Sequence, residues 1–133
     1  MAKPSLLLVD DDKNTLDGLV RILECDGYLV SGVLSGYDAL KLLSQKRFDA
    51  IITDVNMPGM DGFSLIREVK KREEPIVVVV ITANSSINSG ATKKIYYDYY
   101  FTKPVNIQEL EAVLESLLER QQLITQEQLL KKK

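Results

Sequence analysis

The chain has 133 residues, a formal net charge of −2, one cysteine and no histidine. This length suffices for one domain with its own core, and the small net charge argues against broad attraction to nucleic acid or anionic lipid. Cys25 cannot form a disulfide within the chain, which is typical of the cytoplasm, and the absence of histidine excludes the usual zinc sites. The longest apolar run, residues 76–81, is too short to cross a bilayer. We therefore expect a cytoplasmic protein without a membrane span.

The first half of the chain alternates short apolar runs with segments of helical spacing. Strands are predicted at residues 6–9, 28–33 and 50–53, and Ser35 is placed to cap the second helix. Apolar residues at helical spacing follow each of these strands: Leu16, Leu19, Val20 and Leu23, then Ala39, Leu40, Leu42 and Leu43, then Phe63, Ile66 and Val69.

The second half continues the alternation. Residues 76–81 are apolar without interruption, which indicates an interior parallel strand covered on both faces. Residues 84–97 should cross over to the fifth strand at 99–102, but their Asn, Ser and Gly content favours a short or irregular helix. Asn106 and Glu109 are spaced as a capping box before a last apolar stripe. Five such alternations predict an α/β fold with a doubly wound five-stranded parallel sheet.

Polar side chains follow four of the predicted strands. Asp10 and Asp11 follow the first strand, Asp54 the third, Thr82 the fourth and Lys103 the fifth. The carboxyl ends of parallel strands lie at one edge of a sheet, where such folds bind their ligands. We therefore expect these five side chains to converge, although each alone is also consistent with a solvated loop or a strand end.

The acidic side chains of this edge require a cation. Two unit charges about 5 Å apart repel by roughly 3 kcal/mol at an effective dielectric near 20, and Lys103 alone cannot offset three carboxylates. Oxygen ligands without His or Cys favour Mg²⁺, with Mn²⁺ as a second possibility. Asn56, two residues after Asp54, can add a backbone carbonyl oxygen to the metal.

A carboxylate beside a metal ion, an amine and a hydroxyl is suited to phosphoryl transfer. Asp54 would act as the nucleophile and form an acyl phosphate. Lys103 would neutralise charge on the phosphoryl oxygens, and Thr82 and the amide of Ala83 would donate hydrogen bonds to them.

The segments LLLVDDD, IITDVNMPGMDG, VVVITA and YFTKP, in this order and spacing, resemble the receiver domain of two-component response regulators over roughly residues 5–120. The resemblance implies a (βα)5 flavodoxin-like receiver fold and phosphorylation of Asp54 by a sensor histidine kinase or a phosphotransfer protein. It makes Asp10 and Asp11 the acidic pair for Mg²⁺, with Asn56 supplying its main-chain oxygen. It also implies phosphate contacts from Thr82 and Lys103 and a cis bond before Pro104.

The resemblance further implies a switch in which the Thr82 hydroxyl moves toward the phosphoryl group while an aromatic side chain on the fifth strand rotates inward. Spacing from Lys103 indicates Tyr100, among the four tyrosines at 96, 97, 99 and 100. The face made by the fourth helix, the fifth strand and the last helix would then regulate an output domain or partner, or form a homodimer. At Tyr96-Tyr97 the chain departs from the family, which usually has Gly-Ala there.

We interpret residues 1–120 as the receiver domain and residues 121–133 as an extension of the last helix. The extension is either a linker toward an absent output domain, possibly pairing in a dimer, or a solvated end; we favour the linker. The output would be transcription regulation or another activity, without direct nucleic-acid binding by this domain.

Two other classes share parts of this pattern. A haloacid-dehalogenase-type phosphatase also uses a strand-end aspartate and Mg²⁺, but its Asp-x-Asp lies near the first strand and it carries a cap domain. A pseudo-receiver that only binds partners would usually lack a site residue. We therefore expect no enzyme beyond a domain that promotes its own phosphorylation and dephosphorylation.

Overall fold

The computed structural model describes residues 3–57, 59, 62–72, 74–83 and 97–131. Its strands form one parallel sheet with the order β2-β1-β3-β4-β5. The strands are β1 (Ser5–Val9), β2 (Leu29–Val33), β3 (Ala50–Asp54), β4 (Val77–Thr82) and β5 (Tyr99–Thr102), and the helices are α1 (Lys13–Cys25), α2 (Gly36–Leu43), α3 (Gly62–Lys70) and α4 (Ile107–Lys131). The α/β architecture with a doubly wound parallel sheet is therefore confirmed.

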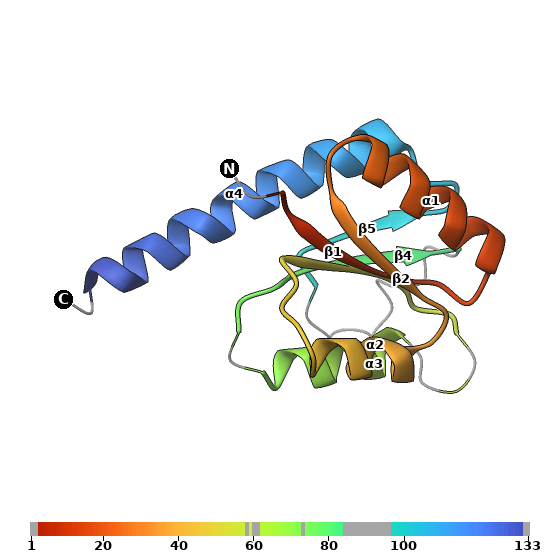
Figure 1. Ribbon diagram of the computed structural model, residues 1–133, viewed down its shortest axis with the longest axis horizontal. Helices are drawn as coiled ribbons and strands as arrows, with labels where there is room; N and C mark the ends of the chain where they lie inside the picture. The colour runs from red at the N-terminus through yellow and green to blue at the C-terminus, as the bar shows by residue number, and fades with distance from the viewer. Residues whose placement is uncertain (1–2, 58, 60–61, 73, 84–96, 132–133) are drawn as a thin grey trace.

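Helices cover both faces of this sheet: α1 and α4 lie on one side, and α2 and α3 lie on the other (Figure 1). Successive side chains of a strand point to opposite faces of the sheet, so each interior strand contributes side chains to two hydrophobic cores. Leu7 and Ile51 belong to the core beneath α2 and α3, whereas Leu8 and Ile52 belong to the core beneath α1 and α4. All six residues of β4 are buried, which explains why its sequence is apolar without alternation.

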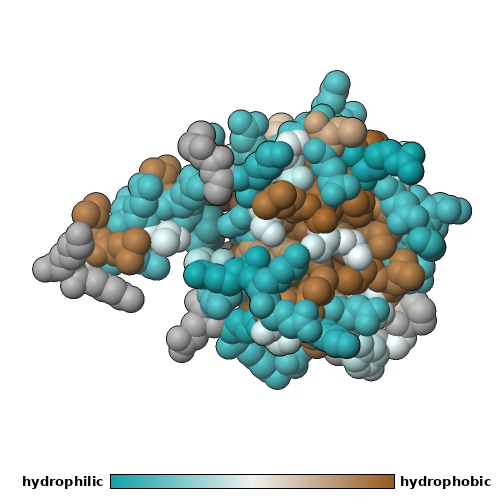
Figure 2. Space-filling view, viewed as in Figure 1, coloured by the Kyte–Doolittle hydropathy of each residue, from teal (hydrophilic) through white to brown (hydrophobic). Residues whose placement is uncertain are grey.

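The two edge strands are more exposed than the interior ones. Leu29 of β2 is 55% exposed and Tyr99 of β5 is 46% exposed, because each strand pairs on one side only. Figure 2 shows hydrophobic side chains gathered over β2, between α1 and α2. The sequence predicts both strands correctly but does not reveal that they form the edges.

Side-chain caps start three of the helices. The Ser35 hydroxyl accepts a hydrogen bond from the Asp38 N–H, and Asn106 Oδ1 accepts one from the Glu109 N–H, as predicted. Asp12 caps α1 by accepting from the N–H groups of residues 14 and 15. Gly27, with a φ of 102°, ends the turn after α1 in a conformation that favours glycine.

The predicted fourth helix falls on residues 84–97, of which 84–96 lie outside the described residues, so the label α4 belongs to the last helix. This helix has 25 residues, and its end extends away from the sheet (Figure 1). Only Leu110 and Leu114 are fully buried, whereas the extension exposes four large apolar side chains: Leu123, Ile124, Leu129 and Leu130. Among the described residues, no helix combines the length and the apolar character needed to cross a membrane.

Candidate functional site

Main-chain hydrogen bonds align the carboxyl ends of the strands. The Asp10 N–H donates to the carbonyl of Val33 at the end of β2 (3.2 Å). The Val55 N–H donates to the carbonyl of Ile81 (3.2 Å), which ties the residue after Asp54 to β4. The Lys103 N–H in turn donates to the carbonyl of Thr82 (2.9 Å). These hydrogen bonds therefore fix the main chain of the polar residues that follow the strands relative to one another.

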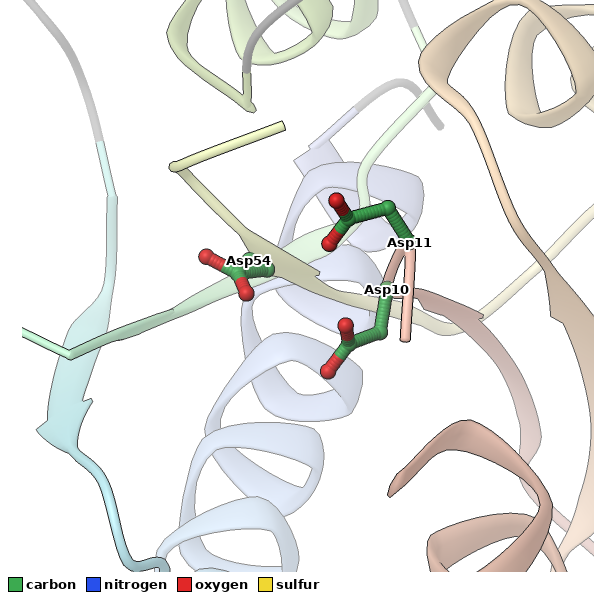
Figure 3. Close-up of side chains that lie close together, drawn as sticks. All are labelled: Asp10, Asp11 and Asp54. Carbon is green, nitrogen blue, oxygen red and sulfur yellow. The ribbon is translucent and has the colours of Figure 1, made fainter. Parts of the chain in front are cut away.

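Three carboxylates meet at this edge. Asp10 and Asp11 project from the end of β1 toward Asp54 at the end of β3 (Figure 3). Each residue offers an oxygen, and these oxygens all lie within 4.8 Å of one another. Asp10 is 9% exposed and Asp54 6%, whereas Asp11 is exposed. Two carboxylates are thus nearly removed from water while the third faces it.

Lys103 links the two buried acids. Its Nζ lies 2.8 Å from Asp54 Oδ2 and 3.4 Å from Asp10 Oδ2. Partial burial would lower the pKa of the Lys103 amine, but the hydrogen bond and charge of Asp54 and the charge of Asp10 outweigh it, so the pKa is raised. Lys103 therefore remains a cation between the carboxylates.

The pKa of Asp10 reflects opposing effects of burial and of the charges in the cluster. Burial raises the pKa of its carboxyl above the ordinary value, and the hydrogen bond from the Asp12 N–H and the charge of Lys103 offset this only in part. The charge of Asp54 raises the pKa further. A second cation at this position would favour the ionised form of Asp10.

The third member of the acidic triplet has another task. Asp12 Oδ2 accepts from the Thr15 hydroxyl (3.1 Å), and its backbone N–H donates to Asp10 Oδ1 (2.9 Å). The hydrogen bond from the Thr15 side chain lowers the pKa of the Asp12 carboxyl. Asp12 thus caps the start of α1 and orients the Asp10 carboxylate. Its position just before a helical pattern could have indicated the capping role, which we did not predict.

Asn56 connects the third and fourth strand ends. Its backbone N–H donates to Asp54 Oδ1 (2.9 Å), and its side-chain Nδ2 donates to Thr82 Oγ1 (3.4 Å). Thr82 at the end of β4 is only 2% exposed, while Ala83 beside it is exposed. The sequence indicated only a backbone carbonyl for Asn56, and its side-chain contact with Thr82 was missed.

The turn after Asp54 depends on a close approach of the backbone. A Cβ added at Gly62 would lie 2.4 Å from the Asp54 carbonyl oxygen and 2.6 Å from Val55 Cα. The Gly62 N–H also donates to the Val55 carbonyl (3.2 Å). Any side chain at position 62 would displace the strand end that carries Asp54.

The tyrosines near β5 separate by face. Tyr100 is half-buried against the α2–α3 core and makes an edge-to-face contact with Tyr97, with ring centroids 5.9 Å apart. Tyr99 instead contacts Phe101, at 5.0 Å. Tyr96 lies outside the described residues. The bond between Lys103 and Pro104 is cis, as expected.

The donor set fits a hard divalent cation. It consists of carboxylate oxygens from two strand ends, and no sulfur or imidazole lies among them. The arrangement as a whole places a buried carboxylate, Asp54, between an ammonium group and two further acids. Such a carboxylate is poised to accept an electrophile while a cation neutralises the charge around it.

Comparisons with known proteins agree with this geometry. A model of the response regulator receiver domain matches residues 6–115. The transcriptional regulatory protein PrrA of Mycobacterium leprae is 36% identical over 121 residues, which cover 90% of this chain and 52% of PrrA. The chain thus spans about half the length of this curated relative.

Solved structures show the same fold. A chain of adenylate cyclase from Rhodopirellula baltica has a TM-score of 0.88 at 27% identity, with 99% of each chain covered. The response regulator protein TrrA of Thermotoga maritima, solved in complex with Mg²⁺-BeF, has a TM-score of 0.78 at 29% identity, covering 86% of this chain and 98% of TrrA. The matched residues and these likenesses show that the chain belongs to the response regulator receiver domain family, a family of signalling proteins.

Proposed function

We propose that the chain is a phosphorylation-dependent switch that accepts a phosphoryl group on Asp54. The observation that carries the proposal is the contact of Lys103 Nζ with Asp54 Oδ2 at 2.8 Å, beside Asp10 and Asp11 within a 4.8 Å carboxylate cluster. A structural ion pair alone would not need two further acids at the same strand edge, because they raise its electrostatic cost.

In the proposed reaction an oxygen of Asp54 attacks the phosphorus atom of a phosphohistidine or acyl phosphate donor. A new P–O bond forms, the bond between phosphorus and the donor breaks, and the donor leaves with its electron pair. Lys103 holds its positive charge beside the phosphoryl oxygens, and Thr82 and the Ala83 N–H donate hydrogen bonds to them. The cis bond at Pro104 follows Lys103 directly in the chain.

Asp10, Asp11, Asp54 and the backbone carbonyl of Asn56 are the groups proposed to hold Mg²⁺. The ion would neutralise the carboxylates and the incoming phosphoryl oxygens. The solved complex of TrrA with Mg²⁺-BeF supports this choice, and Mn²⁺ has the same preference for oxygen ligands.

We propose a sensor histidine kinase or a phosphotransfer protein as the donor, and a cytoplasmic location follows from such a partner. The signal would pass through Thr82 and Tyr100 to the face expected from the predicted fourth helix, β5 and the last helix, α4. That face, or the extension of α4, would contact an output domain or a second copy of the chain. Because PrrA is a transcriptional regulatory protein about twice as long as the aligned region, we propose transcription regulation as the output, with no nucleic-acid contact by this domain.

The extension of α4 beyond residue 120 is proposed as the linker to that output. Its exposed Leu123, Ile124, Leu129 and Leu130 lack cover in the part of the chain that is described. The likeness to the Rhodopirellula baltica chain covers 99% of this chain and so takes in nearly all of this extension.

Intact mass after incubation with Mg²⁺ and acetyl phosphate tests the proposal. We expect the wild-type protein to gain the mass of one phosphoryl group, because Asp54 attacks the donor and acetate leaves. Asp54→Asn should gain none, and omission of Mg²⁺ should slow the gain by at least about tenfold. Asp38→Asn, which alters an exposed carboxylate in the first turn of α2, serves as the matched control. Absence of any gain, or an equal gain in Asp54→Asn, would count against phosphorylation at this site.

A further inference from the structure

Asn56 contacts both groups that the phosphoryl group would meet. Its backbone N–H holds Asp54 Oδ1 at 2.9 Å, while its side-chain amide reaches Thr82 Oγ1 at 3.4 Å across the gap between β3 and β4. In the sheet, Asp54 pairs with Ile81, so Thr82 lies one residue further along the neighbouring strand. One residue therefore spans the distance between the phosphoacceptor and the hydroxyl.

The chemistry of the two groups decides which one donates the hydrogen bond and which one accepts it. A threonine hydroxyl has one hydrogen to donate and two lone pairs, and an amide N–H can only donate. When Asn56 Nδ2 donates to Thr82 Oγ1, the hydroxyl must turn its own hydrogen away from Asn56. At 3.4 Å the hydrogen bond is longer than most N–H···O bonds, so it orients the hydroxyl without binding it strongly.

We propose that Asn56 is a positioning residue, whose side-chain amide sets the orientation of the Thr82 hydroxyl relative to the Asp54 carboxylate. This inference rests on the proposed function, because the oriented hydroxyl is the one that would donate to the phosphoryl group. It assigns a task to the Asn56 side chain that is separate from the metal contact proposed for its backbone carbonyl.

The two side chains differ in burial in a way that makes the inference testable. Asn56 is exposed, whereas Thr82 is 2% exposed. Truncation of Asn56 to alanine therefore removes no core packing, and it leaves the backbone carbonyl and the backbone N–H in place. Thr82→Val keeps the branched shape of threonine and replaces the hydroxyl with a methyl group that can neither donate nor accept a hydrogen bond.

A double-mutant cycle with beryllofluoride as the phosphoryl mimic separates these roles. Affinity is measured by titration calorimetry at saturating Mg²⁺ for the wild type, Asn56→Ala, Thr82→Val and the double variant. Affinity for Mg²⁺ alone and the thermal midpoint are measured for each protein. Asn14→Ala, an exposed asparagine in the first turn of α1, is the control.

Asn56→Ala should weaken beryllofluoride binding about two- to tenfold, the effect of losing one orienting hydrogen bond, with Mg²⁺ affinity and thermal midpoint unchanged. In the Thr82→Val background the same change should have no further effect, because no hydroxyl remains to be oriented. An equal loss in both backgrounds, or no loss in either, would overturn the inference while leaving the proposed function intact. A wild-type protein that binds no beryllofluoride would overturn both.

Discussion

At the scale of single residues, Lys103 pairs with both buried carboxylates of the acidic edge. Its amine lies 2.8 Å from Asp54 and 3.4 Å from Asp10, and its side chain is 30% exposed. Removing one partner of a partly buried ion pair leaves the other charges without compensation, which costs more than the pair itself contributes. The pairing therefore predicts a specific dependence of stability on metal.

Lys103→Met should lower the free energy of unfolding by about 1–3 kcal/mol in metal-free buffer, because two nearly buried carboxylates lose their cation. Mg²⁺ should then stabilise this variant more than it stabilises the wild type. Urea unfolding with and without Mg²⁺ measures both effects. Lys13→Met removes an exposed pair with Asp17 and should cost less than about 1 kcal/mol. Equal stability of Lys103→Met and the wild type in metal-free buffer would contradict the account.

The site residues show what can be predicted from sequence at this scale. Asp10, Asp11, Asp54 and Lys103 were predicted to converge because strand ends of a parallel sheet share one edge, and the structure brings them together. The side chain of Asn56 could not be placed from the sequence. Its 3.4 Å contact with the Thr82 hydroxyl depends on the conformation of the turn after β3, which the sequence pattern does not specify. The hydrophobic pattern of the sequence predicts where a strand lies and where it ends, but not the direction in which a side chain of the following loop points.

At the scale of elements, the contact between α1 and α4 contains a second acidic group. Glu111 of α4 has one oxygen, Oε1, that is shielded from solvent and accepts no hydrogen bond from the part of the chain that is described. Interaction with the side chain of Asp26, burial and the charge of Asp26 raise the pKa of Glu111 to about 7. Glu115 and Tyr28 complete this group. Burial raises the pKa of the Tyr28 hydroxyl, and the charges of Glu111, Glu115 and Asp26 raise it further.

This raised pKa predicts a loss of stability with rising pH. The folded protein holds a proton on Glu111 that the unfolded chain releases near pH 4.5, so the contribution is complete below that pH and disappears as pH rises through about 7. Glu111→Gln, which remains neutral, should remove this part of the pH dependence. Thermal midpoints measured from pH 4 to 8 test the prediction, with Glu119→Gln, which alters an exposed glutamate of α4 outside this group, as control. Parallel curves for the wild type and Glu111→Gln would contradict it.

The Asp26–Glu111 contact also marks a limit of sequence-based prediction for elements. Helical spacing indicated that Leu110 and Leu114 face the core, and both are buried. It gave no sign that Glu111, between them, approaches the C-terminal cap of a helix more than 80 residues earlier in the chain. Contacts between helices depend on how each helix lies across the sheet, which the pattern of a single helix does not contain.

At the scale of the whole molecule, the acidic edge of the sheet is separate from an extension that leaves the domain. The acidic cluster lies at the carboxyl ends of β1 and β3, while the last helix continues past the sheet and exposes apolar side chains (Figures 1 and 2). The alternation of strands and helices along the chain predicted this sheet, because apolar strands that alternate with helices pack as one parallel sheet between two helical layers. The predicted fourth helix, on residues 84–97, stays a prediction.

The central claim is that Asp54, and neither of its acidic neighbours, receives the phosphoryl group. The most direct test incubates the protein with Mg²⁺ and acetyl phosphate, reduces the acyl phosphate with borohydride and locates the reduced residue by tandem mass spectrometry. The account predicts conversion to homoserine at position 54 alone. Reduction at Asp10 or Asp11, or none at position 54, would contradict it.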